Sequence, residues 1–269
     1  MHPISVVRSV MLWALLCCLF SGTATAHAAG TDNVGAMVQS FGKCVGGEGR
    51  ASVLILMDQS QSLRSTDAQN LRASAAKDFA EQLKEFAQDT QTDVSLAVAG
   101  FDGRYHEGRW MALTDPNMAQ AGAEIESVGR QSDGQGTDYV SALQGASKQL
   151  AQDDSKCQLL VFFTDGKYDI GVRTPDDIDE LGATKPYAPD ITLDSEANAA
   201  KAEAAGRAAL CDQGGLADGV RGDSITLLTV ALTGRVDPEA QKFLEAFSTG
   251  SAEGTTCGKP VERAAGAFV

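Results

Sequence analysis

Long apolar runs and basic residues are both scarce in this chain of 269 residues. After Phe20, no stretch approaches the roughly 18 apolar residues that a membrane-spanning helix requires. The chain has 22 Lys and Arg against 36 Asp and Glu, which gives a formal net charge of −14. Such a chain repels polyphosphates and attracts divalent cations and basic surfaces, so we expect no nucleic-acid partner.

Several catalytic signatures are missing as well. There is no Gly-x-Ser-x-Gly nucleophile elbow and no phosphate-cradling GxxxxGK[ST] loop. The chain has three histidines, and His106 is the only one beyond residue 28. Because His106 follows Tyr105 in an expected hairpin, we interpret it as a solvent-facing residue and not as a ligand. A histidine general base thus has a single poor candidate, and we predict that the protein is not an enzyme.

The amino-terminal segment is typical of a secretory signal peptide. Arg8 precedes an uncharged apolar run at residues 9–20, and small residues follow as far as Ala29. Cleavage after Ala26 or Ala28 satisfies the small-residue rule, so we assign residues 1–28 to the signal. The mature chain is then expected to be secreted, either extracellular or in the cell envelope. A retained signal anchor is the alternative.

The cysteines that follow the signal predict two disulfide bonds. They are Cys44, Cys157, Cys211 and Cys257, an even number in a chain sent to an oxidising compartment. No Cys-x-x-Cys knuckle occurs, so zinc is not expected. Spacing alone allows three pairings. We favour Cys157 with Cys211, at the sheet edge away from the polar strand ends, which leaves Cys44 with Cys257 to tie the ends of the domain together.

Short apolar segments alternate with amphipathic ones along the chain. Buried strands are predicted at residues 52–57, 94–101, 158–163 and 225–232, with an antiparallel edge partner at 109–113. Helices are predicted from Thr66 as an N-cap to 86, and at 117–128, 137–150, 197–210 and 238–247. This order implies an α/β fold, a doubly wound, mostly parallel sheet with one antiparallel edge strand and helices on both faces. We see no repeat or linker, so one domain at residues 49–269 follows a lead-in at 29–48.

Residues 167–195 interrupt this alternation. They show little periodicity, contain three prolines, and carry seven acids against three bases. We interpret them as a surface insertion. Loops of this length are uncommon without a role, and its position directly after Asp165 places it near the carboxyl ends of the strands.

Three separate stretches carry oxygen-bearing side chains to one predicted sheet edge. Asp58, Ser60 and Ser62 alternate just past the first strand, Thr137 follows a glycine-rich loop at a helix start, and Asp165 ends another strand. Ligands of open α/β sheets bind beyond the carboxyl ends of the strands. The alternative is that the aspartates only cap strand ends and the hydroxyls only form turns.

The segments DQSQS, GTDY and FFTDG, in that order, resemble the three parts of the metal-ion-dependent adhesion site (MIDAS) of the von Willebrand factor type A (VWA) family. The resemblance covers roughly residues 50–250 and implies the Rossmann-like VWA fold. It also implies that five residues hold a metal, directly or through water: Asp58, Ser60, Ser62, Thr137 and Asp165. Gln61 stands where the family most often has glycine, which removes no ligand oxygen. The composition, rich in alanine, glycine and aspartate, most resembles secreted bacterial members.

Hydroxyl and carboxylate oxygens are hard donors that suit Mg²⁺, or Mn²⁺ or Ca²⁺. The resemblance implies an open metal position that captures an Asp or Glu of a protein partner, so the expected function is divalent-cation-dependent protein binding or cell adhesion. A phosphatase-like metal-dependent hydrolase is one alternative, and a structural scaffold with an idle metal site is another. Residues 266–269 resemble the family's last strand with no final helix after it, which leaves two alternatives: a fragment whose native reading frame continues with an amphipathic helix, or a domain without that helix.

Overall fold

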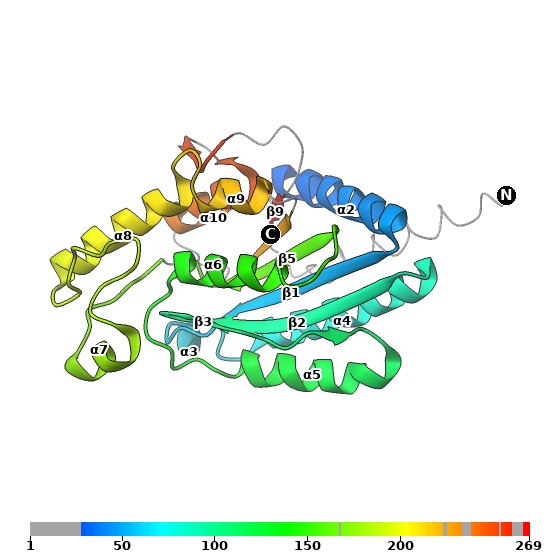
Figure 1. Ribbon diagram of the computed structural model, residues 1–269, viewed down its shortest axis with the longest axis horizontal. Helices are drawn as coiled ribbons and strands as arrows, with labels where there is room; N and C mark the ends of the chain where they lie inside the picture. The colour runs from blue at the N-terminus through cyan, green and yellow to red at the C-terminus, as the bar shows by residue number, and fades with distance from the viewer. Residues whose placement is uncertain (1–27, 167, 223–224, 233–237, 253, 260–265) are drawn as a thin grey trace.

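A mixed seven-stranded sheet forms the centre of the molecule (Figure 1). The computed structural model describes residues 28–166, 168–222, 225–232, 238–252, 254–259 and 266–269. Apart from Ala28, the predicted signal peptide lies outside them. The strand order is β3-β2-β1-β5-β6-β9, and β4 also pairs with β2.

The predicted mostly parallel sheet is confirmed, with two short antiparallel strands where one was predicted. The parallel strands are β1 (Arg50–Asp58), β2 (Asp93–Phe101), β5 (Gln158–Thr164), β6 (Ile225–Ala231) and β9 (Gly266–Phe268). Two short antiparallel strands, β3 (Tyr105–His106) and β4 (Met111–Ala112), pair with β2. A separate hairpin joins β7 (Ser251–Ala252) to β8 (Thr255–Thr256). Because β1 and β5 are parallel neighbours, with Met57 level with Phe163, their polar ends reach the same sheet edge.

Helices cover both faces of the sheet. One face packs against α6 (Tyr139–Leu150), α8 (Glu196–Cys211), α9 (Leu216–Gly222) and α10 (Pro238–Thr249). The other packs against α2 (Ala28–Glu48), α4 (Leu71–Thr90) and α5 (Asp115–Gly129). Alternate residues of β1 serve the two faces, with Leu54 and Leu56 in one core and Val53 and Ile55 in the other. All four are buried, as expected for a strand in a doubly covered parallel sheet.

The predicted helix start at Thr66 is wrong. Thr66 ends a short helix, α3 (Leu63–Thr66), and α4 begins only at Leu71. The carboxylate of Asp67 accepts hydrogen bonds from the backbone N–H groups of Leu71 (2.6 Å) and Arg72 (3.3 Å), so Asp67 satisfies the helix start. The Thr66 hydroxyl does not cap α4; it lies within hydrogen-bond distance of Ser62 O (3.1 Å) and of Asp165 Oδ2 (2.9 Å) at the sheet edge.

Residues 28–48, which the sequence places at the end of the signal and in a lead-in, form the helix α2. Met37, Phe41 and Val45 recur every four residues and are buried against the sheet face that also holds Val53 and Ile55. This segment is therefore part of the core. None of the helices in the described part of the chain combines the length and apolar character that crossing a membrane would need.

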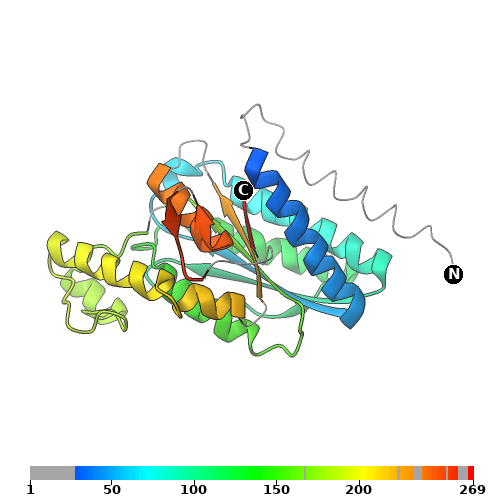
Figure 2. The same ribbon diagram turned by 90° about the horizontal axis from the view of Figure 1, so that it is seen from above.

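The insertion (residues 168–195 of the structure) is anchored at several points and is not a plain surface loop. Tyr168, Ile170 and Leu193 are fully buried in the core beneath α8. Between them lies a further helix, α7 (Pro175–Leu181), which begins with a capping box between Thr174 and Asp177. In both views, α7 and the start of α8 project at one end of the molecule (Figures 1 and 2).

The favoured cysteine pairing is wrong. The disulfides join Cys44 to Cys157 and Cys211 to Cys257. Because α2 runs directly into β1, Cys44 lies at the amino edge of the sheet, where Cys157 precedes β5. The sequence gives residues 29–48 no position in the fold, and the pairing of Cys44 depends on that position. Two disulfides fit a protein of an oxidising, extracellular compartment.

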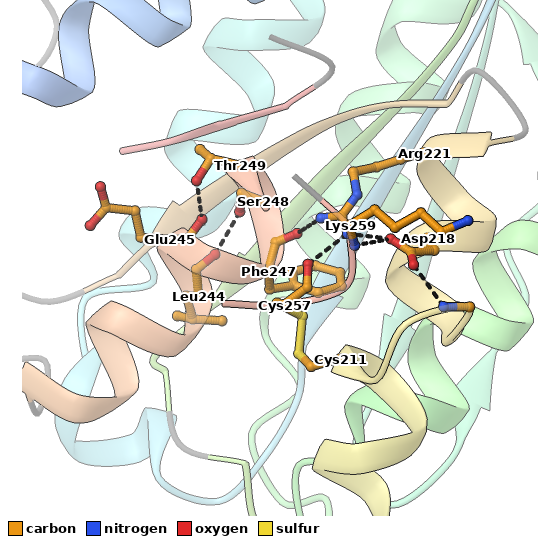
Figure 3. The surroundings of a disulfide bond; sticks show 11 residues. Cys211, Asp218, Arg221, Leu244, Glu245, Phe247, Ser248, Thr249, Cys257 and Lys259 are labelled. Carbon is orange, nitrogen blue, oxygen red and sulfur yellow. Dashed lines mark hydrogen bonds and ion pairs between the residues drawn. A yellow bond between two sulfur atoms is a disulfide. The ribbon is translucent and has the colours of Figure 1, made fainter. Parts of the chain in front are cut away.

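The second disulfide lies in a hydrogen-bonded cluster beside α9 (Figure 3). Arg221 donates to the Asp218 carboxylate (2.9 Å) and to the backbone oxygens of Phe247 (3.0 Å) and Cys257 (2.7 Å). Burial alone would raise the pKa of Asp218, but hydrogen bonds from Gly214, Lys259 and Arg221 outweigh it and lower this pKa to about 2. The cluster thus holds the β7–β8 region against α9.

Removing either disulfide should cost substantial stability. The double variant Cys44→Ser, Cys157→Ser removes a disulfide between residues 113 positions apart in sequence. The double variant Cys211→Ser, Cys257→Ser removes one between residues 46 positions apart. Each pair constrains the unfolded chain, so each double variant is expected to lose about 2–5 kcal/mol of unfolding free energy, the longer loop slightly more. Urea titration measures the loss. Peptide mapping without reductant should recover these two pairs, and any other pairing contradicts the assignment.

Candidate functional site

Three loops meet at the carboxyl edge of β1 and β5. The loop after β1 and the glycine-rich loop before α6 are joined through backbone bonds, from Gln61 N to Gly134 O (3.1 Å) and from Gly134 N to Gln59 O (3.0 Å). The loop after β5 joins the first through a side-chain bond from Thr164 Oγ1 to Asp58 Oδ2 (2.8 Å). The three stretches that carry the predicted ligands therefore converge.

Asp58 is the last residue of β1 at this edge and is fully buried. Its Oδ1 accepts the backbone N–H of Ser60 (2.8 Å), and its Oδ2 accepts the Thr164 hydroxyl. Burial raises the pKa of the Asp58 carboxyl from 3.8 to about 7, and the negative charge of Asp165 adds to the shift. A cation between these two carboxylates would offset the cost of holding both charges there.

The hydroxyls of Ser60 and Ser62 face one another. Their Oγ atoms are 2.9 Å apart, with Ser60 buried and Ser62 exposed. The alternation of the two serines along the turn therefore points both oxygens to one side, as the Asp-x-Ser-x-Ser spacing predicts.

Asp165 provides the clearest sign of a missing partner. Its side chain is buried at 8% exposure, Oδ2 accepts the Thr66 hydroxyl (2.9 Å), and Oδ1 has no hydrogen-bond partner within the described residues. An unpaired buried carboxylate oxygen is costly, and a metal ion is one group that satisfies it. The donor set and this orphaned oxygen both fit a hard cation.

Thr137 is held by its backbone. Its N–H donates to Asp169 O (2.5 Å), Asp169 N donates back to Thr137 O (3.3 Å), and the residue is 3% exposed. Gly136 just before it has φ +80°, and a Cβ there would lie 2.9 Å from Asp169 O, so this turn requires glycine. The insertion therefore contacts the loop that carries the fourth predicted ligand.

Sequence reasoning missed three hydroxyls around the site. Thr66 and Thr164 bond the two aspartates, and the Tyr139 hydroxyl lies 2.9 Å from Thr164 Oγ1. Burial raises the pKa of Tyr139 well above its ordinary range, and the charge of Asp58 contributes. Thr164 and Tyr139 lie within the MIDAS-like segments and could have been flagged there, whereas Thr66 carries no signal beyond its place after the serine turn.

His106 lies on β3, outside the three loops. Its side chain is 35% exposed, with Nε2 3.2 Å from Asp102 Oδ1. It is thus half-buried beside a carboxylate, less open than the predicted solvent-facing position.

The five predicted ligands comprise two carboxylates and three hydroxyls. No group of three or more His, Cys, Asp or Glu side chains suited to a metal is found in the described ranges. A metal here would therefore depend on hydroxyl and water oxygens for the rest of its shell, a coordination that suits Mg²⁺ better than softer metals.

The comparison with known families decides the classification. The family model described as von Willebrand factor type A domain matches residues 53–167, a segment that contains all five predicted ligands. This chain contains a VWA domain. No curated protein matches it by sequence.

Among solved structures, the VWA chain is similar to bacterial pilus proteins. The PilB minor pilin of Streptococcus sanguinis is 13% identical with a TM-score of 0.50, over 79% of this chain and 56% of that one. The vWF domain of the type V pili tip protein Mfa5 of Porphyromonas gingivalis is 13% identical with a TM-score of 0.47, over 74% of this chain and 86% of that one. The pilus adhesin SpaC of Lactobacillus rhamnosus GG is 14% identical with a TM-score of 0.46, over 74% of this chain and 26% of that one. The chain spans little more than half of the PilB chain, and the likeness concerns the fold.

Proposed function

We propose that this VWA domain binds another protein through a divalent cation, to which the partner contributes an Asp or Glu carboxylate. Asp58, Ser60, Ser62, Thr137 and Asp165 would hold the ion, with Mg²⁺ the best match to short hydroxyl and carboxylate donors and Mn²⁺ or Ca²⁺ as substitutes. The observation that carries the proposal is that three loops meet at the sheet edge that holds Asp58 and Asp165, and that Asp165 Oδ1 lacks a partner among the described residues.

The charge of the protein favours strict metal dependence. At a formal net charge of −14, the surface repels a partner's carboxylate unless a cation lies between the two. Two protein carboxylates at most neutralise a divalent ion and the hydroxyls add no charge, so a bound ion keeps its affinity for an outside anion. A minor pilin is among the proteins of similar fold, which supports adhesion at a cell surface or in the envelope as the setting.

A metal-dependent hydrolase is the main rival. Aspartates past parallel strands also serve phosphoryl transfer, but Ser60 stands where an Asp-x-Asp phosphatase has its second aspartate, and His106 lies outside the site. A substrate panel of phosphate esters and carboxyl esters with Mg²⁺ separates the two. Turnover that disappears in Asp58→Ala would overturn the binding proposal, whereas the expected result is no metal-dependent turnover.

Partner capture tests the proposal directly. The immobilised mature chain is incubated with the envelope and extracellular proteins of its source cell in Mn²⁺, eluted with EDTA, and compared with Asp165→Asn and with Asp133→Asn, an exposed acid of the glycine-rich loop. We expect the same eluted protein from the unmodified chain and from Asp133→Asn, and none from Asp165→Asn. Replacing the partner's acidic residues singly should identify one whose loss abolishes capture; metal-independent capture contradicts the proposal.

A scaffold role with an idle metal site makes a different prediction. In that case the folded chain takes up no Mg²⁺ at millimolar concentration, and chelator changes no interaction.

A further inference from the structure

Two contacts of the insertion reach Thr137 and its neighbour Asp138, in addition to the packing of the insertion in the core. The first is the pair of backbone bonds between Asp169 and Thr137. The second is an ion pair from Lys185 Nζ to Asp138 Oδ2 at 2.8 Å, with side chains that are 4% and 0% exposed. Asp138 directly follows Thr137 in the chain, so both contacts act on the same predicted ligand.

Asp138 is the residue that orients the start of α6. Its Oδ1 accepts the backbone N–H groups of Val140 (3.0 Å) and Ser141 (3.1 Å), and its own N–H donates to Asp102 O (2.8 Å). Asp138 Oδ2 accepts the Ser141 hydroxyl (2.7 Å) and pairs with the Lys185 ammonium, which also donates to Gly103 O (2.6 Å). The ammonium of Lys185 thus bridges the α6 cap and the turn after β2, across the loop that carries Thr137.

We propose that Lys185 is a positioning residue for the metal site: through Asp138 it fixes Thr137, and it thereby links the placement of the insertion to metal affinity. The inference rests on the proposed function. Its physical basis is that a buried carboxylate without its counter-ion is strongly unfavourable. Without Lys185, Asp138 would have to move toward water, and the adjacent Thr137 would move with it.

The coupling between metal affinity and the placement of the insertion is reciprocal. If Lys185 makes metal affinity depend on the insertion, metal binding must order the insertion by the same free energy. α7, which presents the exposed Ile178, would then be placed by the ion before a partner arrives. A lysine that merely anchored the insertion to the core would leave metal affinity and this coupling unchanged.

Lys185→Met tests the role, because it removes the charge and keeps the aliphatic stem. The matched control is Lys201→Met on the exposed face of α8. Mg²⁺ affinity is measured by isothermal titration, and hydrogen exchange is followed by mass spectrometry with and without Mg²⁺. We expect Kd to rise about 10–100-fold in Lys185→Met, the range for groups that orient metal ligands, and to stay unchanged in Lys201→Met.

Hydrogen exchange distinguishes a positioning role of Lys185 from a purely anchoring one, because an anchoring lysine would not affect Mg²⁺-dependent protection. In the unmodified chain, saturating Mg²⁺ should slow exchange in peptides covering residues 168–195, and this protection should be absent in Lys185→Met. Without metal, exchange at the Thr137 amide should quicken in the variant while β1 and β5 stay protected. A Kd within two-fold of the unmodified chain, together with retained Mg²⁺ protection of the insertion, overturns the proposal.

A second variant covers the case in which Lys185→Met does not fold. Lys185→Met with Asp138→Asn removes both charges and keeps a capping side chain, so no uncompensated carboxylate is left. It should fold, bind Mg²⁺ more weakly, and exchange faster at Thr137; unchanged exchange there overturns the positioning role. If the unmodified chain takes up no Mg²⁺, the proposed function fails, and exchange at Thr137 in the metal-free variants still shows whether Lys185 fixes this loop.

Discussion

Asp58→Ala is expected to abolish Mg²⁺ binding, raising Kd at least about 100-fold above that of the unmodified chain, because groups that only orient metal ligands already contribute about 10–100-fold. Asp58 supplies one of the two carboxylates at the site and is fully buried there. Isothermal titration of the metal-free protein with Mg²⁺ and with Mn²⁺ measures the effect. Circular dichroism should show little change of fold.

Two comparison variants sharpen this test. Asp133→Ala removes an exposed acid from the glycine-rich loop and should leave Kd unchanged, since a surface carboxylate adds only screened attraction. Thr164→Val removes the hydroxyl that donates to Asp58 Oδ2. Its Kd for Mg²⁺ should lie between the values for Asp58→Ala and Asp133→Ala. Equal Mg²⁺ uptake by Asp58→Ala and Asp133→Ala would mean that the ion binds elsewhere or only as a diffuse counter-ion.

The strands were predictable because their physical signature is local. A parallel strand covered on both faces is apolar at every position, so β1 and β5 stand out as continuous runs that end abruptly on aspartates. Parallel pairing then brings those ends to one edge, which is why sequence order predicted the convergence of the three loops that carry the proposed ligands. The resemblance to the VWA family made the same prediction from the motifs themselves.

What could not be predicted depends on positions that only the tertiary structure fixes. α2 is rich in alanine and glycine, and its helical signal is the apolar stripe of Val34, Met37, Val38, Phe41 and Val45. Without α2, Cys44 had no position, and the pairing of all four cysteines was mispredicted. The ion pair of Lys185 is harder still to predict, because its partner Asp138 is about 47 positions away in sequence and nothing in the local composition marks the pair.

The boundary between α3 and α4 shows how a polar pair decides a local structure. Propensity alone favours one helix from Thr66, but the Asp67 carboxylate captures the first N–H groups of α4 and is itself neutralised by Arg72 at 2.8 Å. These two side chains are 1% and 2% exposed. Arg72 also donates to Gln131 O (2.8 Å), which links α4 to the segment that leads into the glycine-rich loop.

Arg72→Met is therefore expected to destabilise the protein strongly. It leaves the buried Asp67 carboxylate without its counter-ion and Gln131 O without its donor, at a cost of about 3–5 kcal/mol, a large share of the roughly 5–15 kcal/mol that stabilises a typical domain. Urea unfolding at pH 7 should show a lower midpoint with an unchanged slope. The matched control is Arg64→Met, because exposed Arg64 donates to Ser132 O of the same segment and should cost under about 1 kcal/mol.

Asp67→Asn combined with Arg72→Met separates the two sources of this cost. Asparagine keeps an oxygen for the N–H groups at the start of α4 and carries no charge, so the double variant should be more stable than Arg72→Met by at least about 1 kcal/mol. Recovery of that size would assign the loss to the uncompensated carboxylate, because the aliphatic packing is the same in both variants. If the double variant were no more stable than Arg72→Met, the arginine would instead act through its stem and its bond to Gln131, and α4 would begin at Leu71 without help from the ion pair.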